Sequence, residues 1–223
     1  MSKIALITGA SRGLGAALAE QLALRGWHVI ALARTTGGLE SLDDRVRAHG
    51  LPGAGSLTLA PMDVTNDDAM RHLAGSIASR WGGLGFWAHT AIHATALAPA
   101  SSVDMKDLDK SIATNLRATS HLITLIEPLL RTGKGTALIP DDPFPGSANS
   151  AAYGASKAGQ IALARAWAQE TARIGPKVVI AAANPMPTAL RARFHPGEDR
   201  SPLADPKAEA LRLLDLALDP ALA

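Results

Sequence analysis

Residues 8–15 read TGASRGLG and join an aliphatic, strand-like run, residues 4–8, to an amphipathic helical pattern, residues 14–25. Glycines at this position let the backbone turn tightly and approach a diphosphate, while the following helix presents free N–H groups and the positive end of its dipole. A glycine-rich turn alone is weak support, because ordinary strand-to-helix loops also carry glycine. The strand before it and the helix after it together predict a dinucleotide-binding loop. We expect cofactor contacts from Gly9, Ser11, Arg12, Gly13, Leu14 and Gly15.

Short aliphatic runs alternate with longer amphipathic stretches along the rest of the chain. This pattern is typical of βαβ units, so we expect a three-layer α/β Rossmann fold with a parallel sheet of about six strands flanked by helices. Two segments rich in proline and glycine, residues 140–146 and 184–206, are predicted to be loops. The expected strands are residues 4–8, 28–33, 57–62, 84–88, 136–139 and 177–182. The expected helices include residues 14–25, a helix capped by Thr65 or Asn66, and residues 104–130, 153–174 and 206–218.

Length and composition restrict the class of protein. The chain of 223 residues suits one α/β domain, and we expect a single dinucleotide-binding domain over residues 1–223. No segment offers the roughly 18 uninterrupted apolar residues that cross a bilayer, and the N-terminus lacks the pattern of an export signal. The chain has no cysteine, and its net charge of +2 comes without a dense run of Lys and Arg. We therefore expect a cytoplasmic protein that binds neither membrane nor nucleic acid.

A second motif lies at the start of the long helical pattern over residues 153–174. Tyr153 and Lys157 are four residues apart in the run YGASK, which is about one helical turn, so their polar ends can converge on one site. A phenol with a reference pKa of about 10 is a poor acid–base group at neutral pH, but a nearby ammonium favours the phenolate. We therefore expect Lys157 to lower the pKa of Tyr153. The alternative is a half-exposed tyrosine beside a solvated lysine.

The end of the second predicted strand indicates which dinucleotide is bound. Residues 28–34 read HVIALAR and contain no acidic residue to accept the adenosine ribose hydroxyls, as an NAD-binding protein usually requires. Arg34 follows the strand and Arg12 lies in the glycine loop, so two guanidinium groups can converge on a 2′-phosphate. This pattern favours NADP over NAD. The alternative is a pair of surface arginines that only solvate the loop.

These motifs and their order are similar to those of the short-chain dehydrogenase/reductase superfamily, and the resemblance covers most of the chain. The glycine spacing, three residues and then one, is that of the family. The resemblance implies that Asp63 and Val64 hold the adenine ring, and that Asn115 bends its helix and orders a water in a proton relay. It also implies that Tyr153 exchanges a proton with the substrate oxygen as hydride moves, while Lys157 binds the nicotinamide ribose. The implied reaction interconverts a carbonyl and an alcohol.

The family's catalytic serine has no counterpart here. Counting seven residues on from Gly135 reaches Asp142, and counting thirteen back from Tyr153 reaches Pro140. An ionised Asp142 has only acceptor atoms and would make Tyr153 harder to deprotonate, whereas a protonated Asp142 could donate a hydrogen bond. Two alternatives therefore stand: a slow NADP-dependent oxidoreductase acting on a small carbonyl or alcohol, or a dinucleotide-binding sensor or partner subunit with little or no catalysis. The expected catalytic residues are Tyr153, Lys157, Asn115 and Asp142.

Two further family motifs differ in this chain. Residues 89–92 read HTAI where the family's Asn-Asn-Ala-Gly normally stabilises the central sheet. Pro185 lacks the glycine that usually follows it, although Thr188 remains able to bind the nicotinamide amide or the diphosphate. His89 and His93 lie four residues apart, but no third ligand stands at a useful spacing, so we expect no metal site.

The end of the chain bears on assembly. Family members usually follow the helix equivalent to residues 206–218 with a seventh strand, whereas this sequence stops at Ala223. We therefore expect a C-terminally shortened sheet of six strands that lacks one of the usual subunit contacts. The remaining contact face would be formed by the helices of residues 104–130 and 153–174, and the second is rich in alanine, which allows close helix approach. These features predict a homodimer through the two helices.

Overall fold

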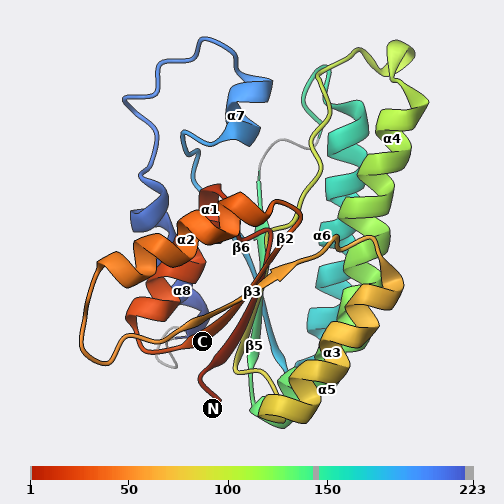
Figure 1. The fold of residues 1–223 in the computed structure, drawn as a ribbon. Helices are drawn as coiled ribbons and strands as arrows, with labels where there is room; N and C mark the ends of the chain where they lie inside the picture. The colour runs from red at the N-terminus through yellow and green to blue at the C-terminus, as the bar shows by residue number, and fades with distance from the viewer. Residues whose placement is uncertain (1, 143–145, 219–223) are drawn as a thin grey trace.

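A parallel sheet runs through the centre of the molecule (Figure 1). The computed structural model describes residues 2–142 and 146–218. The strands are β1 (Ile4–Thr8), β2 (His28–Ala33), β3 (Leu57–Pro61), β4 (Phe86–His89), β5 (Thr136–Asp141) and β6 (Lys177–Ala182). They pair in the order β3-β2-β1-β4-β5-β6, which is the doubly wound arrangement of Rossmann folds. The predicted fold class and the six strands are confirmed.

Helices cover both faces of this sheet. They are α1 (Gly13–Leu24), α2 (Thr36–Ala48), α3 (Asp67–Trp81), α4 (Met105–Ser111), the π-helical segment η2 (Ile112–Arg117), α5 (Ala118–Gly133), α6 (Ala151–Thr171), α7 (Ala189–Phe194) and α8 (Pro206–Leu218). α1, α2 and α8 lie on one side of the sheet, and α3 to α6 lie on the other (Figure 1). Among the helices of the described residues, none combines the length and the apolar composition needed to cross a bilayer.

Each face of the sheet has its own hydrophobic core. Side chains alternate along β1, so Ala5 and Ile7 pack with the α1, α2 and α8 layer while Leu6 packs with the α3 and α5 layer. In β4, Phe86 belongs to the first core and Trp87 to the second. All five side chains are fully buried, as expected of central parallel strands covered on both faces. The two cores fix the carboxyl ends of the strands, where the predicted motifs lie.

The observed strands differ from the predicted ones only at their ends. β1, β2 and β6 have the predicted bounds, β3 is one residue shorter, and β4 begins and ends later than predicted. Pro140 and Asp141 were predicted in a loop, but they extend β5, because β6 continues to pair with the strand as far as Asp141. Pro140 is tolerated there because the pairing of β5 with β4 ends at Leu138. Residues 143–145 of the predicted loop lie outside the described residues.

The helix predicted over residues 104–130 is present from Met105 onward, with a π-helical segment inside it. The segment is divided into α4, the π-helical η2 and α5, and α5 continues to Gly133. Asn115 lies inside η2. Single π-helical turns within α-helices are frequent at functional sites, and a periodicity of 3.6 residues does not reveal them.

The structure also settles details of three helices that the sequence left open or did not indicate. Of the two candidate caps of α3, Asn66 is the one used, since its Oδ1 accepts a hydrogen bond of 3.0 Å from the N–H of Ala69. α6 begins at Ala151 and ends at Thr171, slightly before the predicted bounds. The predicted loop over residues 184–206 contains α7, a short helix that the surrounding proline and glycine residues concealed.

Candidate functional site

The glycine loop lies between β1 and α1 and has the backbone conformation that its glycines permit. Gly9 and Gly13 have φ values of +81° and +56°, in the left-handed region. A Cβ at Gly9 would lie 2.7 Å from backbone atoms of Thr90 and Ala91, so only glycine fits where this loop meets the end of β4. Arg12 is the N-cap of α1, and its side chain makes no capping hydrogen bond. The first turn of α1 is therefore suited to an anion such as a diphosphate.

The loops that follow β1, β4 and β6 meet at the carboxyl end of the sheet. The chain leaves β1 toward β2 on one side and reaches β4 on the other, which is the switch point where doubly wound sheets bind ligands. A Cβ at Gly13 would lie 3.3 Å from Cγ2 of Thr188, so the segment after β6 borders the glycine loop. Pro185 lies in the same segment, and its carbonyl accepts a hydrogen bond from the N–H of Ala204.

Arg34 and the glycine loop occupy the same edge of this site. Arg34 follows β2 with its side chain 60% exposed, and its Nη1 lies 3.9 Å from Oδ2 of Asp63. A Cβ at Gly38 in α2 would lie 2.8 Å from Cβ of Ser11, so the segment after Arg34 packs on the loop that carries Arg12. The segments that carry the two arginines predicted to meet a 2′-phosphate are thus in contact.

The pair predicted to hold the adenine ring is well ordered by its own turn. Oδ1 of Asp63 accepts hydrogen bonds from the N–H and the hydroxyl of Thr65, at 2.9 and 2.8 Å. Val64 is buried against the core beneath α3. The side chain of Asp63 therefore has a fixed orientation after β3.

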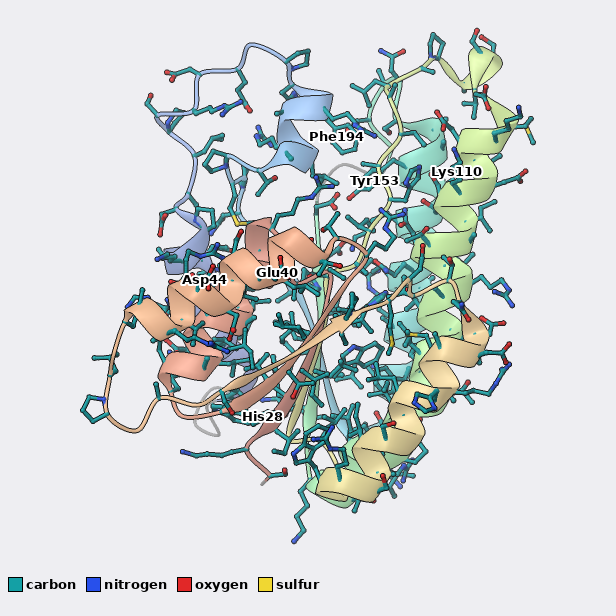
Figure 2. All side chains as sticks on the ribbon, in the orientation of Figure 1. His28, Glu40, Asp44, Lys110, Tyr153 and Phe194 are labelled. Atoms are coloured by element: carbon teal, nitrogen blue, oxygen red, sulfur yellow. The ribbon has the colours of Figure 1, made fainter. Side chains whose placement is uncertain are left out.

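Tyr153 and Asp142 are in direct contact. Oη of Tyr153 donates a hydrogen bond of 2.6 Å to Oδ2 of Asp142. Tyr153 lies in the first turn of α6 and is only 2% exposed, and its ring packs against that of Phe194 in α7, with 4.9 Å between the ring centroids. Figure 2 shows both rings at the end of the molecule that carries α7, opposite His28. Asp142 therefore faces the phenol at the place where the family's serine is expected.

The pKa of Tyr153 shifts in the direction opposite to the predicted one. Burial raises this pKa above its usual value of 10, and the charge and hydrogen bond of Asp142 raise it further, with a smaller contribution from Asp141. The prediction that Lys157 lowers the pKa of Tyr153 is wrong, because burial and two carboxylates determine the shift. The phenol of Tyr153 is held protonated.

The ammonium group of Lys157 has other partners. Its Nζ donates to the backbone carbonyl of Pro140 at 2.5 Å and to Oε1 of Gln160 at 2.7 Å. Burial lowers the pKa of Lys157, while Asp142 and Asp141 act in the opposite direction. Lys157 and Tyr153 share a face of α6, as their spacing predicts. The ammonium group of Lys157, however, is bound to the backbone of β5.

Asn115 connects three parts of the site. Its Oδ1 accepts from the N–H of His93 at 2.7 Å, and its Nδ2 donates to the carbonyl of His93 and the hydroxyl of Ser156, both at 2.9 Å. Asn115 is fully buried in η2. It fastens the segment after β4 to α6, close to Lys157.

His89, the last residue of β4, also belongs to this site, although sequence motifs predicted no functional role for it. Its Nδ1 lies 2.8 Å from Oγ1 of Thr8, and its Nε2 lies 2.9 Å from Oγ1 of Thr119. Burial, together with the nearby charge of Lys157, lowers the pKa of His89 from 6.5 to about 3. The side chain is therefore a neutral connector between β1 and α5. The sequence signal for His89 was the change of the family's Asn-Asn-Ala-Gly to HTAI at residues 89–92. No motif indicated that Gln160 belongs to the site.

Comparison with known proteins agrees with this arrangement. A family model described as short chain dehydrogenase matches residues 3–199. Sulfoacetaldehyde reductase 2 of Chromohalobacter salexigens is 32% identical over 169 residues, which cover 71% of this chain and 62% of the relative. A tropinone reductase homolog of Arabidopsis thaliana is 30% identical over 176 residues, covering 76% of this chain and 64% of the relative. The chain thus spans less than two thirds of the length of these curated relatives.

Solved structures have the same fold. A metagenomic short-chain oxidoreductase in complex with NADP superposes with a TM-score of 0.78 at 26% identity. The match covers 96% of this chain and 90% of that one.

Proposed function

Because the chain belongs to the short chain dehydrogenase family, we propose that it is an NADP-dependent oxidoreductase that interconverts a carbonyl and an alcohol on a small molecule. The observation that carries this proposal is the position of the Tyr153 phenol. Its hydroxyl lies against Asp142 at the carboxyl end of β5, and Lys157 follows one helical turn later. A phenol at this end of a doubly wound sheet lies where a bound substrate would need a proton.

The residues around the glycine loop fit a dinucleotide phosphate. The glycine loop and the N-terminus of α1 would hold the diphosphate, Arg12 and Arg34 the 2′-phosphate, and Thr188 the diphosphate or the nicotinamide amide. A bound NADP(H) supplies or accepts the hydride. A similar protein of known structure was solved in complex with NADP, which supports this choice.

Within the protein, Tyr153 would act as the proton donor to the carbonyl oxygen. Its hydrogen is held at Oη and directed toward Asp142, so the substrate oxygen must replace the carboxylate as acceptor. The charge of Asp142 opposes formation of the phenolate that is left after proton transfer. These two effects predict a slow reaction, with Asn115 shaping the helix beside the reacting groups.

The same contacts favour a second candidate function, a dinucleotide-binding sensor or partner subunit with little catalysis. The proton of Tyr153 points at a carboxylate, and the ammonium of Lys157 binds Pro140 and Gln160. The phenol would have to release Asp142 before it could donate its proton to a substrate oxygen. The two functions share the cofactor and differ in turnover.

The discriminating experiment measures binding first and turnover second. The protein is titrated with NADPH and NADH, and the better binder is then screened with aldehydes and ketones, including sulfonated aldehydes. NADPH binding with consumption of at least one carbonyl supports the oxidoreductase. NADPH binding without turnover favours the sensor, and no binding of either dinucleotide contradicts both.

We also propose that this domain forms a homodimer in the cytoplasm. The contact face would consist of α4, α5 and α6. On α6, three small side chains at helical spacing are exposed, which permits close approach of a second helix. They are Ala155, Ala158 and Ala162.

A further inference from the structure

Gln160 is a buried residue of α6 that belongs to none of the predicted motifs. Its Oε1 accepts a hydrogen bond from the ammonium of Lys157, which also binds the carbonyl of Pro140. Gln160 is 1% exposed and Lys157 is 5% exposed, so the contact is shielded from water. An ammonium has three N–H donors. Within the described residues two of them have acceptors, and the third is available to a further one.

A chain of buried hydrogen bonds leads from Gln160 back to the glycine loop. Nε2 of Gln160 donates to Oγ1 of Thr119 at 2.9 Å, and the same oxygen lies 2.9 Å from Nε2 of His89. Nδ1 of His89 reaches Oγ1 of Thr8, the last residue of β1. Each of these side chains is buried. The position of Lys157 is therefore tied to the strand that carries the glycine loop.

The directions of these hydrogen bonds determine how the Gln160 amide is oriented. The hydroxyl of Thr119 donates to the carbonyl of Asn115 at 2.7 Å, so its oxygen remains an acceptor. The NH₂ group of Gln160 must then face Thr119, and its carbonyl oxygen must face Lys157. Exchanging the two amide atoms would place two donors against each other at Lys157. The network thus presents an acceptor to the ammonium and no donor.

We propose that Gln160 is a positioning residue for Lys157, holding its ammonium at Pro140 so that the third N–H can bind the ribose of a dinucleotide. The inference rests on the proposed function, since it concerns the same cofactor. Without the amide, the ammonium keeps one protein acceptor and its long side chain gains freedom. A hydrogen bond to a charged, buried group contributes more than one between neutral groups, so its loss should be measurable.

Other charged groups also face the ammonium. Asp141, the last residue of β5, and Asp142, which follows it, favour the protonated form of Lys157, and burial opposes it. His89 of β4 stays neutral, and Tyr153 holds its proton one turn earlier on α6. Gln160 therefore adds a neutral acceptor beside the two carboxylates at and just after the end of β5.

The test replaces Gln160 with methionine, which has a similar volume but no strong acceptor. Fluorescence titration should show about 10- to 100-fold weaker NADPH binding in Gln160→Met. The control is Gln169→Met, at an exposed position of the same helix, whose affinity should match that of the wild type. Lysine-labelled protein observed by NMR, with Lys157→Arg to assign the signal, should show a lower pKa of Lys157 in Gln160→Met.

A second variant distinguishes the loss of the hydrogen bond to Lys157 from a change in side-chain packing. Gln160→Glu keeps an oxygen acceptor for Lys157, and the hydroxyl of Thr119 can turn from Asn115 to donate to the second carboxylate oxygen. This variant should therefore bind NADPH within about threefold of the wild type. A loss in Gln160→Glu as large as that expected for methionine would overturn the proposal, as would unchanged or tighter NADPH binding in Gln160→Met. If the wild type binds no NADPH, the proposed function fails. The NMR titration then decides alone: a lowered pKa of Lys157 in Gln160→Met supports the role of Gln160, and an unchanged one refutes it.

Discussion

The hydroxyl of Tyr153 donates to the carboxylate of Asp142 across 2.6 Å, so a residue expected near the position of the family's serine is in contact with the phenol. A serine there would donate to the reacting oxygen, whereas the carboxylate can only accept. Loss of one such preorganised donor typically costs about 100- to 1,000-fold in rate.

The first prediction concerns this substitution. Asp142→Ser should raise the steady-state rate of carbonyl reduction by about tenfold or more, because it restores a donor and removes a charge that opposes the phenolate. Asp68→Ser, at a side chain that is 93% exposed on α3, serves as the control and should leave the rate unchanged. A large loss of activity in Asp142→Ser would instead identify the aspartate as a catalytic group.

The second prediction concerns cofactor choice. Arg34→Ala should weaken NADPH binding by about tenfold or more and leave NADH binding nearly unchanged, because only NADPH carries the 2′-phosphate. Arg173→Ala, at an exposed arginine in the turn just after α6, is the matched control. Equal affinity of the wild type for the two dinucleotides, or an unaltered NADPH affinity in Arg34→Ala, would count against this assignment.

The third prediction is a pH dependence of stability that originates in His89. Its pKa is lowered from 6.5 to about 3 in the folded protein, so the unfolded chain takes up a proton at a higher pH than the folded one. This contribution to the free energy of unfolding is present above pH 6.5 and is lost as the pH falls toward 3. By pH 5, the loss amounts to about 2 kcal/mol.

Urea unfolding at pH 7 and pH 5 measures this effect. His89→Asn should lose less stability than the wild type between the two values, whereas the exposed control His72→Asn should behave like the wild type. An identical pH dependence in His89→Asn and the wild type would contradict the assignment.

The fourth prediction concerns assembly. Size-exclusion chromatography with light scattering at micromolar concentration should give a dimer, and Ala158→Arg should convert it to a monomer by placing a long charged side chain on the exposed face of α6. Arg173→Ala again serves as the control. A monomeric wild type under these conditions would refute the proposed helix contact.

Local patterns were sufficient to predict most of the fold. The residues around Gly9 predicted a strand, a tight turn and a helix because glycine is required where the chain has positive φ and meets a neighbouring loop. Counting from Gly135 along β5 reached Asp142, which contacts Tyr153, because the residues between them form regular strand. Counting back from Tyr153 reached Pro140 instead, because the segment between Asp142 and Tyr153 is two residues shorter than the family spacing.

The partners of Lys157 could not be predicted in this way. Spacing places Lys157 and Tyr153 on one face of α6, but it does not say which acceptor the ammonium binds. That depends on Gln160 and Thr119, which come from different helices, and on burial. The sign of the Tyr153 pKa shift depends on the same tertiary environment. Local propensity also missed α7, where neighbouring prolines and glycines give opposing signals.

We propose Tyr153 as the proton donor of an NADPH-dependent carbonyl reduction. The most direct measurement follows NADPH oxidation by wild type and Tyr153→Phe at equal concentration on a carbonyl compound that the wild type turns over. Removing the hydroxyl while keeping the ring preserves the contact with Phe194. We expect the rate to fall by at least about 100-fold in Tyr153→Phe. Undiminished turnover by Tyr153→Phe would contradict this proposal.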